Sequence, residues 1–276
     1  MNEEIITSRQ NSTVRTVCAL SEKKARKESG LFRFDGIKLL GEAIASEMDI
    51  RYVVYNAEAS ERVVGYVREK REELERGGAR MVAVSASVFD KISEEKAPEG
   101  IVTVAAVPSA LKRRYSSADD IPAMSEKILV AQSLRDPANL GTIMRSAYAL
   151  GIDRLVLTDD CAEIYSPKTL RAAMGAAFRL SVLEVEQSRF VEFIGELRKQ
   201  GRRVFATALS DNSATLGSFD MRACDCFVIG NEGHGLSNEA ISACDGSVII
   251  PMREGAESLN AAAAAAICIW ETVTAK

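Results

Sequence analysis

The distribution of hydrophobic and polar positions divides the chain into two segments, each with alternating helical and extended patterns. In the first segment, runs with helical periodicity alternate with short runs rich in β-branched and aromatic residues. The expected helices span residues 14–30, 36–46, 60–78 and 86–93, and the expected strands span 31–34, 51–55, 80–85 and 100–107. The pattern predicts a small α/β domain over residues 1–107. Residues 108–126 lose the periodicity and contain two prolines and several serines, which predicts a linker.

The second segment, residues 127–276, contains near-continuous apolar runs. Such runs are typical of strands in a parallel sheet that is covered on both faces. The expected strands span 128–134, 154–159, 202–209, 226–231 and 247–252, and the expected helices span 139–151, 167–178, 188–201, a short stretch after Ser237, and 258–273. A second α/β domain is therefore predicted. In open parallel sheets ligands bind at the carboxyl ends of the strands, so the loops that follow these strands are the candidate site.

Composition and charge exclude several classes of protein. The chain is 47% hydrophobic and 27% charged with a net charge of −4, which favours an ordinary globular protein without general attraction to nucleic acid or anionic membranes. The six cysteines lack C-x-x-C spacing and accompany one histidine, so we expect reduced thiols, no metal site and a cytoplasmic location. The N-terminus has no signal-peptide pattern and no apolar run approaches about 18 residues, so neither secretion nor membrane insertion is expected.

One stretch of the chain is basic, although the net charge of the protein is negative. Eight basic residues against three acidic ones lie between Arg9 and Lys38. The basic residues are Arg9, Arg15, Lys23, Lys24, Arg26, Lys27, Arg33 and Lys38. They could form a face that binds phosphates, or simply the solvated face of a helix.

The segment "RDPANLGTIMRSAYALGI", residues 135–152, follows the first strand of the second domain. Asn139 is a candidate N-cap, and a stripe of apolar residues marks the buried face of the helix. Gly141 in the first turns and Arg145 near the positive end of the helix dipole are both unfavourable for the helix alone. Arg145 would reach back over the space beside Gly141, where an anion or a hydroxyl group could bind; the alternative is an exposed arginine beside an incidental glycine.

The segment "IGNEGHGLSNEA", residues 229–240, is a glycine-rich loop. Its glycines do not form the G-x-G-x-x-G pattern of dinucleotide-binding folds, and the carboxylate of Glu232 would repel a phosphate. We therefore expect the glycines, Gly230 among them, to bring the backbone close to a ligand with few negative charges. His234 could be a general base, but no nucleophile motif accompanies it, and an incidental loop histidine is the favoured interpretation.

The segment "IIPMREGAESLNAAAAAAICIWE", residues 249–271, follows the last strand. The pattern predicts that Ser258 caps a long helix whose first turn holds Leu259 and Asn260. The alanine run is a strong helix former, and its small side chains also allow another backbone to approach closely.

Taken in order, three segments resemble the motifs of the SpoU (TrmH-like) class of RNA ribose 2'-O-methyltransferases, in the SPOUT superfamily. They are "DPANLGTIMRSAYALG", "VIGNEGHGLS" and "IIPMREGAESLNAAAAAA", and the resemblance covers residues 127–276, including "SPKTLRAAMGAAFRL" between the motifs. In the N-terminal domain, "IITSRQNSTVRTVCAL" and "FRFDGIKLLGEAI" are similar to the substrate-binding domain of such enzymes, which resembles a ribosomal RNA-binding protein. Asp35 stands where that pattern more often has glutamate.

The resemblance implies a parallel-sheet SPOUT domain with a deep trefoil knot that binds S-adenosyl-L-methionine, acting as a homodimer without a metal. It implies catalytic-site roles for Asn139, Arg145, Glu232, Ser258 and Asn260. It implies cofactor contacts, mainly through the backbone, at Thr207, Ala208, Leu209, Gly230, Ile250 and Leu259. The alanine-rich last helix would suit the dimer interface.

The implied reaction is methyl transfer to a ribose 2'-hydroxyl, with ribosomal (23S) RNA favoured over transfer RNA because of the N-terminal domain. We expect Arg145 to stabilise charge on phosphate and alkoxide rather than to act as a base, because a guanidinium has a pKa above about 12. The alternatives are a tRNA 2'-O-methyltransferase, a non-catalytic RNA-binding or ribosome-assembly protein, and a nucleotide-dependent oxidoreductase, which the absent G-x-G-x-x-G pattern disfavours.

Overall fold

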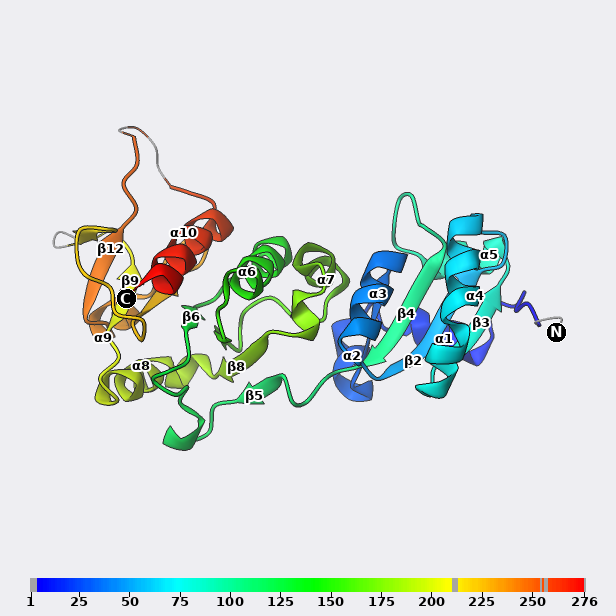
Figure 1. Ribbon diagram of the computed structural model, residues 1–276, viewed down its shortest axis with the longest axis horizontal. Coiled ribbons are helices and arrows are strands. Elements are labelled where there is room, and N and C mark those ends of the chain that lie inside the picture. The colour runs from blue at the N-terminus through cyan, green and yellow to red at the C-terminus, as the bar shows by residue number, and fades with distance from the viewer. Residues whose placement is uncertain (1–3, 210–212, 254, 256–257, 276) are drawn as a thin grey trace. The chain divides into compact units, whose positions relative to one another are not determined.

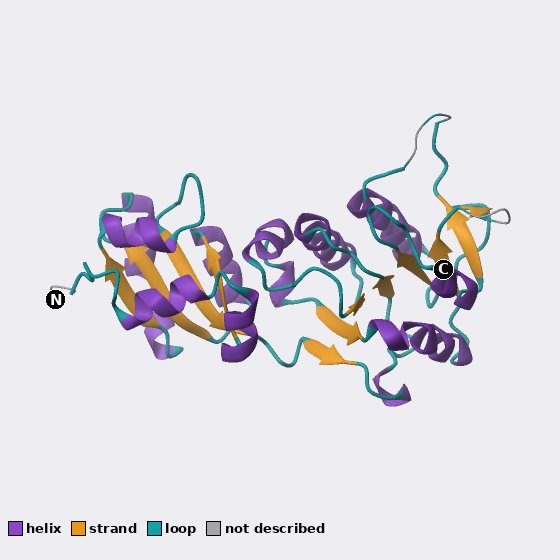
Figure 2. Ribbon diagram, turned by 180° about the vertical axis from the view of Figure 1, so that it is seen from behind, coloured by secondary structure: helices purple, strands orange, loops and turns teal. Residues whose placement is uncertain are grey.

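The computed structural model describes residues 4–209, 213–253, 255 and 258–275. The chain forms two compact units, one of residues up to 108 together with 165–178, and one of residues 109–164 and 179–276 (Figure 1). Both are α/β units, with the helices in purple and the strands in orange in Figure 2.

The first unit contains a four-stranded sheet with the order β1-β4-β2-β3. β4 is antiparallel to β1 and β2, whereas β2 and β3 are parallel. The strands are β1 (Leu31–Asp35), β2 (Ile50–Asn56), β3 (Arg80–Val84) and β4 (Ile101–Ala106), and the helices are α1 (Ser12–Ala19), α2 (Lys23–Ser29), α3 (Ile37–Ala45), α4 (Glu61–Arg76) and α5 (Ala86–Ile92). Val14 and Val17 of α1 and Phe89 of α5 join the valines of β2, β3 and β4 in one apolar core.

The single helix expected over residues 14–30 is two helices, α1 and α2, separated by a turn. The side chain of Arg26 is buried and donates hydrogen bonds to the carbonyl oxygens of Leu20 (2.7 Å) and Ser21 (2.6 Å) in that turn. Arg26 therefore satisfies the carbonyl groups at the end of α1, which a broken helix would otherwise leave without partners.

Residues 165–178, which the sequence pattern assigned to the second domain, group with the first unit. This segment includes α7 (Pro167–Ala173). The ring centroids of Tyr165 and Phe178 lie 4.7 and 6.1 Å from that of Phe32, and Phe178 lies 5.2 Å from Phe34. These aromatic contacts on one face of β1 account for the grouping.

The second unit contains an eight-stranded sheet with the order β10-β12-β9-β11-β6-β7-β8-β5, in which all the pairings are parallel. Its strands are β5 (Lys112–Arg114), β6 (Ile128–Ala131), β7 (Arg154–Thr158), β8 (Ser181–Val185), β9 (Val204–Thr207), β10 (Ala214–Thr215), β11 (Cys226–Ile229) and β12 (Gly246–Ile249). Its α-helices are α6 (Pro137–Leu150), α8 (Phe190–Lys199), α9 (Asn238–Ala243) and α10 (Ala261–Thr274). In Figure 1, α6 and α10 lie on one side of this sheet and α8 and α9 on the other.

Three of these strands, β5, β8 and β10, were not expected. β5 lies inside the expected linker and has the sequence KRR, which is unusual for a strand. It pairs with β8, and Glu184 of β8 forms ion pairs with Lys112 (2.8 Å) and Arg114 (3.2 Å) of β5. The partner strand thus supplies the stabilisation that the sequence of β5 lacks.

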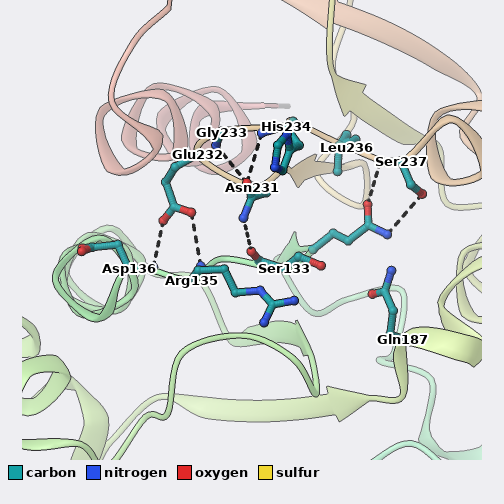
Figure 3. Close-up of a pocket in the computed structure, with 12 residues that line it drawn as sticks. Ser133, Arg135, Asp136, Gln187, Asn231, Glu232, Gly233, His234, Leu236 and Ser237 are labelled. Carbon is teal, nitrogen blue, oxygen red and sulfur yellow. Dashed lines mark hydrogen bonds between the residues drawn. The ribbon is translucent and has the colours of Figure 1, made fainter.

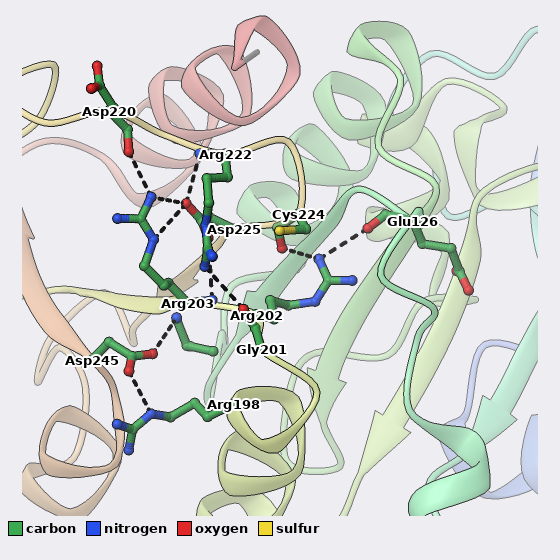
Figure 4. A network of polar contacts seen from close by, with 11 residues as sticks. Glu126, Arg198, Gly201, Arg202, Arg203, Asp220, Arg222, Cys224, Asp225 and Asp245 are labelled. Atoms are coloured by element: carbon green, nitrogen blue, oxygen red, sulfur yellow. Dashed lines mark hydrogen bonds and ion pairs between the residues drawn. The ribbon is translucent and has the colours of Figure 1, made fainter.

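A polar network fixes the amino ends of β9, β11 and β12 (Figure 4). Asp225, which is fully buried just before β11, forms ion pairs with Arg203 and Arg222. Asp245, just before β12, pairs with Arg198 (2.9 Å) and accepts a hydrogen bond from the backbone N–H of Val204. Burial acts to raise the pKa of Asp225, but the hydrogen bonds from Arg203 and Arg222 outweigh it and lower that pKa. The network anchors the strands at the end opposite the candidate site.

Candidate functional site

The three motif segments meet at the carboxyl ends of β6, β11 and β12. α6 follows β6, the glycine-rich loop follows β11, and α10 follows β12. α10 returns from β12 to pack against α6 and β11. The topology therefore brings together segments that are more than ninety residues apart, as the contact between Asn139 and Glu232 shows.

The first turn of α6 is capped by Asp136 and not, as expected, by Asn139. The Asp136 carboxylate accepts a hydrogen bond from the backbone N–H of Asn139 (2.8 Å), and Pro137 occupies the first helical position. Both features are typical of a helix start. The cap leaves the side chain of Asn139 available for contacts with the other two segments.

Asn139 joins the glycine-rich loop to the last helix. Its Nδ2 donates to Oε1 of Glu232 (3.1 Å), and its Oδ1 accepts from Nδ2 of Asn260 (2.9 Å). Asn260 is also the N-cap of α10, since its Oδ1 accepts from the backbone N–H of Ala262 (2.9 Å) and Ala263 (3.3 Å). The cap expected at Ser258 was therefore wrong by two residues, and one amide both starts α10 and fixes it to α6.

Glu232 is the acceptor at the centre of this cluster. Besides Asn139, its carboxylate accepts hydrogen bonds from the backbone N–H groups of Arg135 (3.2 Å) and Asp136 (3.3 Å). Partial burial acts to raise the pKa of Glu232, but the bond from Asn139 and the backbone bonds outweigh it, so the pKa lies below its usual range. Glu232 is therefore a fixed carboxylate that orders α6, and not a proton donor at neutral pH.

The structure does not bring Arg145 and Ser258 into this cluster. Arg145 is exposed on α6, and its side chain forms no hydrogen bond or ion pair with the described residues. Ser258 is also exposed and forms no hydrogen bond with the residues that the structure describes. Gly141 is buried in α6, and α6 packs against α10. The expectation that Arg145 reaches over the space beside Gly141 stays a prediction.

Gly230 is needed for the packing of the loop upon itself. A Cβ atom on Gly230 would lie 2.5 Å from the carbonyl carbon of Gly235 and 2.6 Å from the nitrogen of Leu236. Backbone hydrogen bonds in both directions between Asn231 and Gly235 (3.0 Å each) close the loop at this point. The close approach expected at Gly230 is thus, in the described structure, an approach to its own chain.

Sequence reasoning missed three polar residues that hold these loops. Asn231 donates from Nδ2 to the Ser133 carbonyl oxygen (2.7 Å). Gln132 is buried and accepts from the backbone N–H of Ser237 (3.1 Å). Asp160 accepts from the hydroxyl of Ser133 (2.7 Å). Asn231 lies within a motif segment and Gln132 lies four residues before one, whereas no motif marks Asp160.

The residues expected to contact a cofactor follow three adjacent strands, β12, β9 and β11. Thr207 ends β9 and donates from its hydroxyl to the Val228 carbonyl oxygen of β11 (2.8 Å). Leu209 and Leu259 are 88% and 40% exposed, and Ile250 is half-buried. Exposed leucines that follow adjacent strands would suit a ligand with apolar parts.

A cavity of about 840 Å³ lies beside the glycine-rich loop (Figure 3). It is lined by residues that follow β6, β8 and β11, among them Arg135, Gln187 and His234. Asp136 and Glu232 border it, so the cavity adjoins the Asn139 cluster. His234 is exposed, and its backbone N–H donates to Oδ1 of Asn231 (3.1 Å).

Two further properties concern metals and membranes. Within the described residues, no three His, Cys, Asp or Glu side chains are grouped so that they could hold a metal ion. No helix in those parts of the chain combines the length and apolar character needed to cross a membrane.

Residues 126–270 match the model of the SpoU rRNA Methylase family. The chain belongs to this family. Residues 11–103 match a second model, the MRM3-like substrate binding domain. The two matches cover most of the chain. The boundary between them, residues 104–125, includes the point after residue 108 at which the second unit begins.

Two named relatives are similar to this SpoU protein over nearly their full lengths. It is 29% identical to the Bacillus subtilis 23S rRNA (guanosine(2553)-2'-O)-methyltransferase RlmP, over 96% of this chain and 97% of the relative. It is 27% identical to the 23S rRNA (uridine(2479)-2'-O)-methyltransferase of Streptomyces viridochromogenes, over 97% and 91%. The structure of an AdoMet-bound rRNA methyltransferase from Sinorhizobium meliloti matches with a TM-score of 0.81 at 28% identity, covering 98% of this chain and 97% of the other.

Proposed function

We propose that this SpoU protein transfers a methyl group from S-adenosyl-L-methionine to a ribose 2'-hydroxyl of 23S ribosomal RNA. Family membership and the full-length similarity to named 23S rRNA 2'-O-methyltransferases support the reaction and the RNA class. The observation that carries the proposal is the hydrogen-bonded chain from Asn260 through Asn139 to Glu232, because it joins all three motif segments in one site.

S-adenosyl-L-methionine is the expected cofactor, and the residues after β9, β11 and β12 fit it. The half-buried Ile250 and the exposed Leu209 and Leu259 would provide apolar contacts for the cofactor. Thr207, Ala208 and Gly230 would contribute backbone groups that read a neutral adenine edge. When bound, the cofactor supplies the methyl group.

Arg145 is proposed to contact the RNA substrate. Its guanidinium is exposed and has no partner within the described residues, so its donors are available for a phosphate or for a developing alkoxide. Asn139, Glu232 and Asn260 are positioning residues, because they fix α6, which carries Arg145. Ser258 is exposed beside the capped end of α10 and is proposed to contact substrate or cofactor from there.

We also propose that the domain is knotted and that the protein is a homodimer. The return of α10 from β12, near one edge of the sheet, across to α6 and β11 supports a knotted path. Ile267 and Trp270 of α10 and Tyr148 of α6 are 37%, 57% and 47% exposed, and large exposed apolar side chains on adjacent helices support a dimer interface there. A cytoplasmic location is part of this proposal, and a ribosomal RNA substrate supports it.

Transfer of labelled methyl groups to purified RNA tests this function. The protein is incubated with methyl-labelled S-adenosyl-L-methionine and either unmodified 23S rRNA or bulk transfer RNA. We expect label in 2'-O-methyl nucleosides of the rRNA. Label in the tRNA alone would favour a tRNA 2'-O-methyltransferase. Absence of label in either RNA, despite RNA binding, would favour a non-catalytic RNA-binding protein.

A further inference from the structure

The cavity beside the glycine-rich loop is separate from the residues expected to bind the cofactor. Those residues follow β12, β9 and β11, whereas the cavity is lined by residues that follow β11, β6 and β8. None of Thr207, Ile250 and Leu259 lines it. The loop after β11 therefore borders both this cavity and the expected cofactor site. The volume of the cavity, about 840 Å³, falls within the usual range for a small-ligand pocket.

The charges at the cavity argue against a phosphate or another anion. The carboxylates of Asp136 and Glu232 border it, and Glu232 is ionised at neutral pH because its pKa is lowered. Arg135 is the nearby cation, but its guanidinium donates to Asp160 (2.7 Å). An anion would meet two carboxylates and an arginine that is already paired, so the cavity favours a neutral ligand.

The lining side chains that form no hydrogen bond with the described residues suit a flat ligand with polar edges. The amide of Gln187 and the ring of His234 form no side-chain hydrogen bond with the described residues, and both line the cavity. Gln187 faces the loop that carries His234 from the opposite side (Figure 3). Leu236, a buried residue of the apolar core, adds a small apolar surface to the wall. An amide that can donate and accept, a ring for stacking and an apolar wall together match a nucleobase.

We propose that this cavity binds the unstacked base of the nucleotide whose ribose is methylated, with Gln187 and His234 as specificity-determining residues. The inference rests on the proposed function, because it takes RNA as the substrate. Glu232 borders the cavity and also accepts from Asn139, so a base held there has its ribose next to the motif cluster. Sequence-specific proteins commonly read RNA through bases that are splayed out of the strand.

A cycle of protein and RNA variants tests the proposal. Once the methylated position is known, the substrate is a short RNA with that nucleotide either intact or abasic but with its 2'-hydroxyl retained. The proteins are the wild type, Q187L, H234A and, as a matched control outside the cavity, Q200L. The measured quantities are kcat/KM for each RNA and the Kd of S-adenosyl-L-methionine.

Removal of the base should lower kcat/KM of the wild type and of Q200L by about tenfold or more, since lost stacking and a lost hydrogen bond each reduce binding. Q187L and H234A should be impaired on the intact RNA by a similar factor but lose at most about twofold more on the abasic RNA, because residues in contact are not additive. Their cofactor Kd should stay within about twofold, since no cofactor contact is removed.

Three results would overturn the proposal. If the loss of kcat/KM caused by each substitution and the loss caused by removal of the base were fully additive, Gln187 and His234 would not contact the base. A weakened cofactor Kd in Q187L would show that the cavity belongs to the cofactor site. Full activity of the wild type on the abasic RNA would show that the base is not held. A wild type without methyl transfer to any rRNA position would instead mean that the proposed function itself has failed.

Discussion

Asn139 on α6 donates a hydrogen bond to Glu232 in the glycine-rich loop, at 3.1 Å, and both side chains have further partners that fix them. Glu232 accepts three N–H groups in all, and Asn139 also accepts from Asn260. This pair couples the start of the helix that carries Arg145 to the loop after β11. A change at either residue should therefore alter catalysis through the position of α6.

Replacing Glu232 by glutamine should impair turnover. The carboxylate accepts N–H groups with both oxygens, whereas a glutamine amide would direct its own NH₂ group at one of these donors. The lost bonds amount to about 1–3 kcal/mol, which corresponds to a fall in kcat of about five- to 150-fold if the loss is felt in the transition state. E239Q, on the exposed first turn of α9, is the control and should keep wild-type kcat. A wild-type kcat for E232Q would show that the cluster does not position the site.

Alanine substitutions at two glycines of the same loop should differ sharply. A Cβ atom on Gly230 would overlap the backbone of Gly235 and Leu236, whereas one on Gly233 has its nearest neighbour, Oδ1 of Asn231, at 3.6 Å. G230A should therefore weaken S-adenosyl-L-methionine binding at least about tenfold and destabilise the domain by about 2 kcal/mol or more, because backbone atoms must shift. G233A should be close to wild type in both. Calorimetric titration and thermal unfolding measure the two effects, and equal behaviour of the variants would refute the loop geometry.

Asp225 should stabilise the second unit in a manner that depends on pH. Its pKa is lower in the folded protein than its ordinary value of 3.8, so the folded state favours the charged form. The stabilisation is therefore fully present above that ordinary value and is lost as the pH falls through the folded pKa. D225A should lower the free energy of unfolding at pH 7 by about 3 kcal/mol, since it removes the acceptor shared by Arg203 and Arg222.

Denaturant titrations of wild type and D225A between pH 7 and pH 3 measure this difference. It should shrink at the acid end of the range. D119A is the control, because Asp119 is exposed and has no partner within the described residues. A difference between wild type and D225A that does not change with pH would contradict the assignment of the stabilisation to the carboxylate.

The exposed lysines of α2 are one part of the basic segment that can bind RNA. Lys23, Lys24 and Lys27 are exposed, whereas Arg26 and Arg33 are buried and their substitution would disturb folding. Reversing the charge of the three lysines should weaken RNA binding and flatten its dependence on salt, because each lost phosphate contact removes about 0.7–0.9 from the slope of log K against log salt. The same reversal at the exposed Arg62, Arg68 and at Lys70 of α4 is the control. If both sets of substitutions weakened RNA binding equally, the cause would be the change in net charge, and α2 would not be a specific RNA-binding surface.

The sequence predicted the two α/β patterns and most of the strands, because buried strands have apolar runs that need no partner to be recognised. It could not predict β5, whose basic residues pair with β8, where Glu184 balances the charges of Lys112 and Arg114. It also placed two helix caps wrongly. Asp136 and Asn139, like Ser258 and Asn260, are equally good caps by residue type. Only the tertiary bonds between Asn139, Glu232 and Asn260 decide which of them is used.

The candidate site shows the same division. The motif residues Asn139, Glu232 and Asn260 were expected together, and they meet. The supporting residues Gln132 and Asn231 were not expected, since an isolated amide beside a strand end carries no signal until its partners are known. Roles for Arg145 and Ser258 stay predictions, because their side chains face solvent.

Arg145 should be required for methyl transfer but not for cofactor binding. R145A removes donors proposed to contact the substrate and no donor used within the described residues. The Kd of S-adenosyl-L-methionine should therefore stay within a few fold, measured by calorimetric titration, while methyl transfer falls by at least about a hundredfold. A variant with normal transfer would remove Arg145 from the reaction.

The central claim is tested most directly by mapping 2'-O-methyl positions in total RNA from cells with and without the gene. We predict that cells without the gene lose one methylation, at a position in 23S rRNA, and that the wild-type gene restores it whereas the R145A gene does not. An unchanged set of 2'-O-methyl positions in ribosomal RNA would contradict the proposed function.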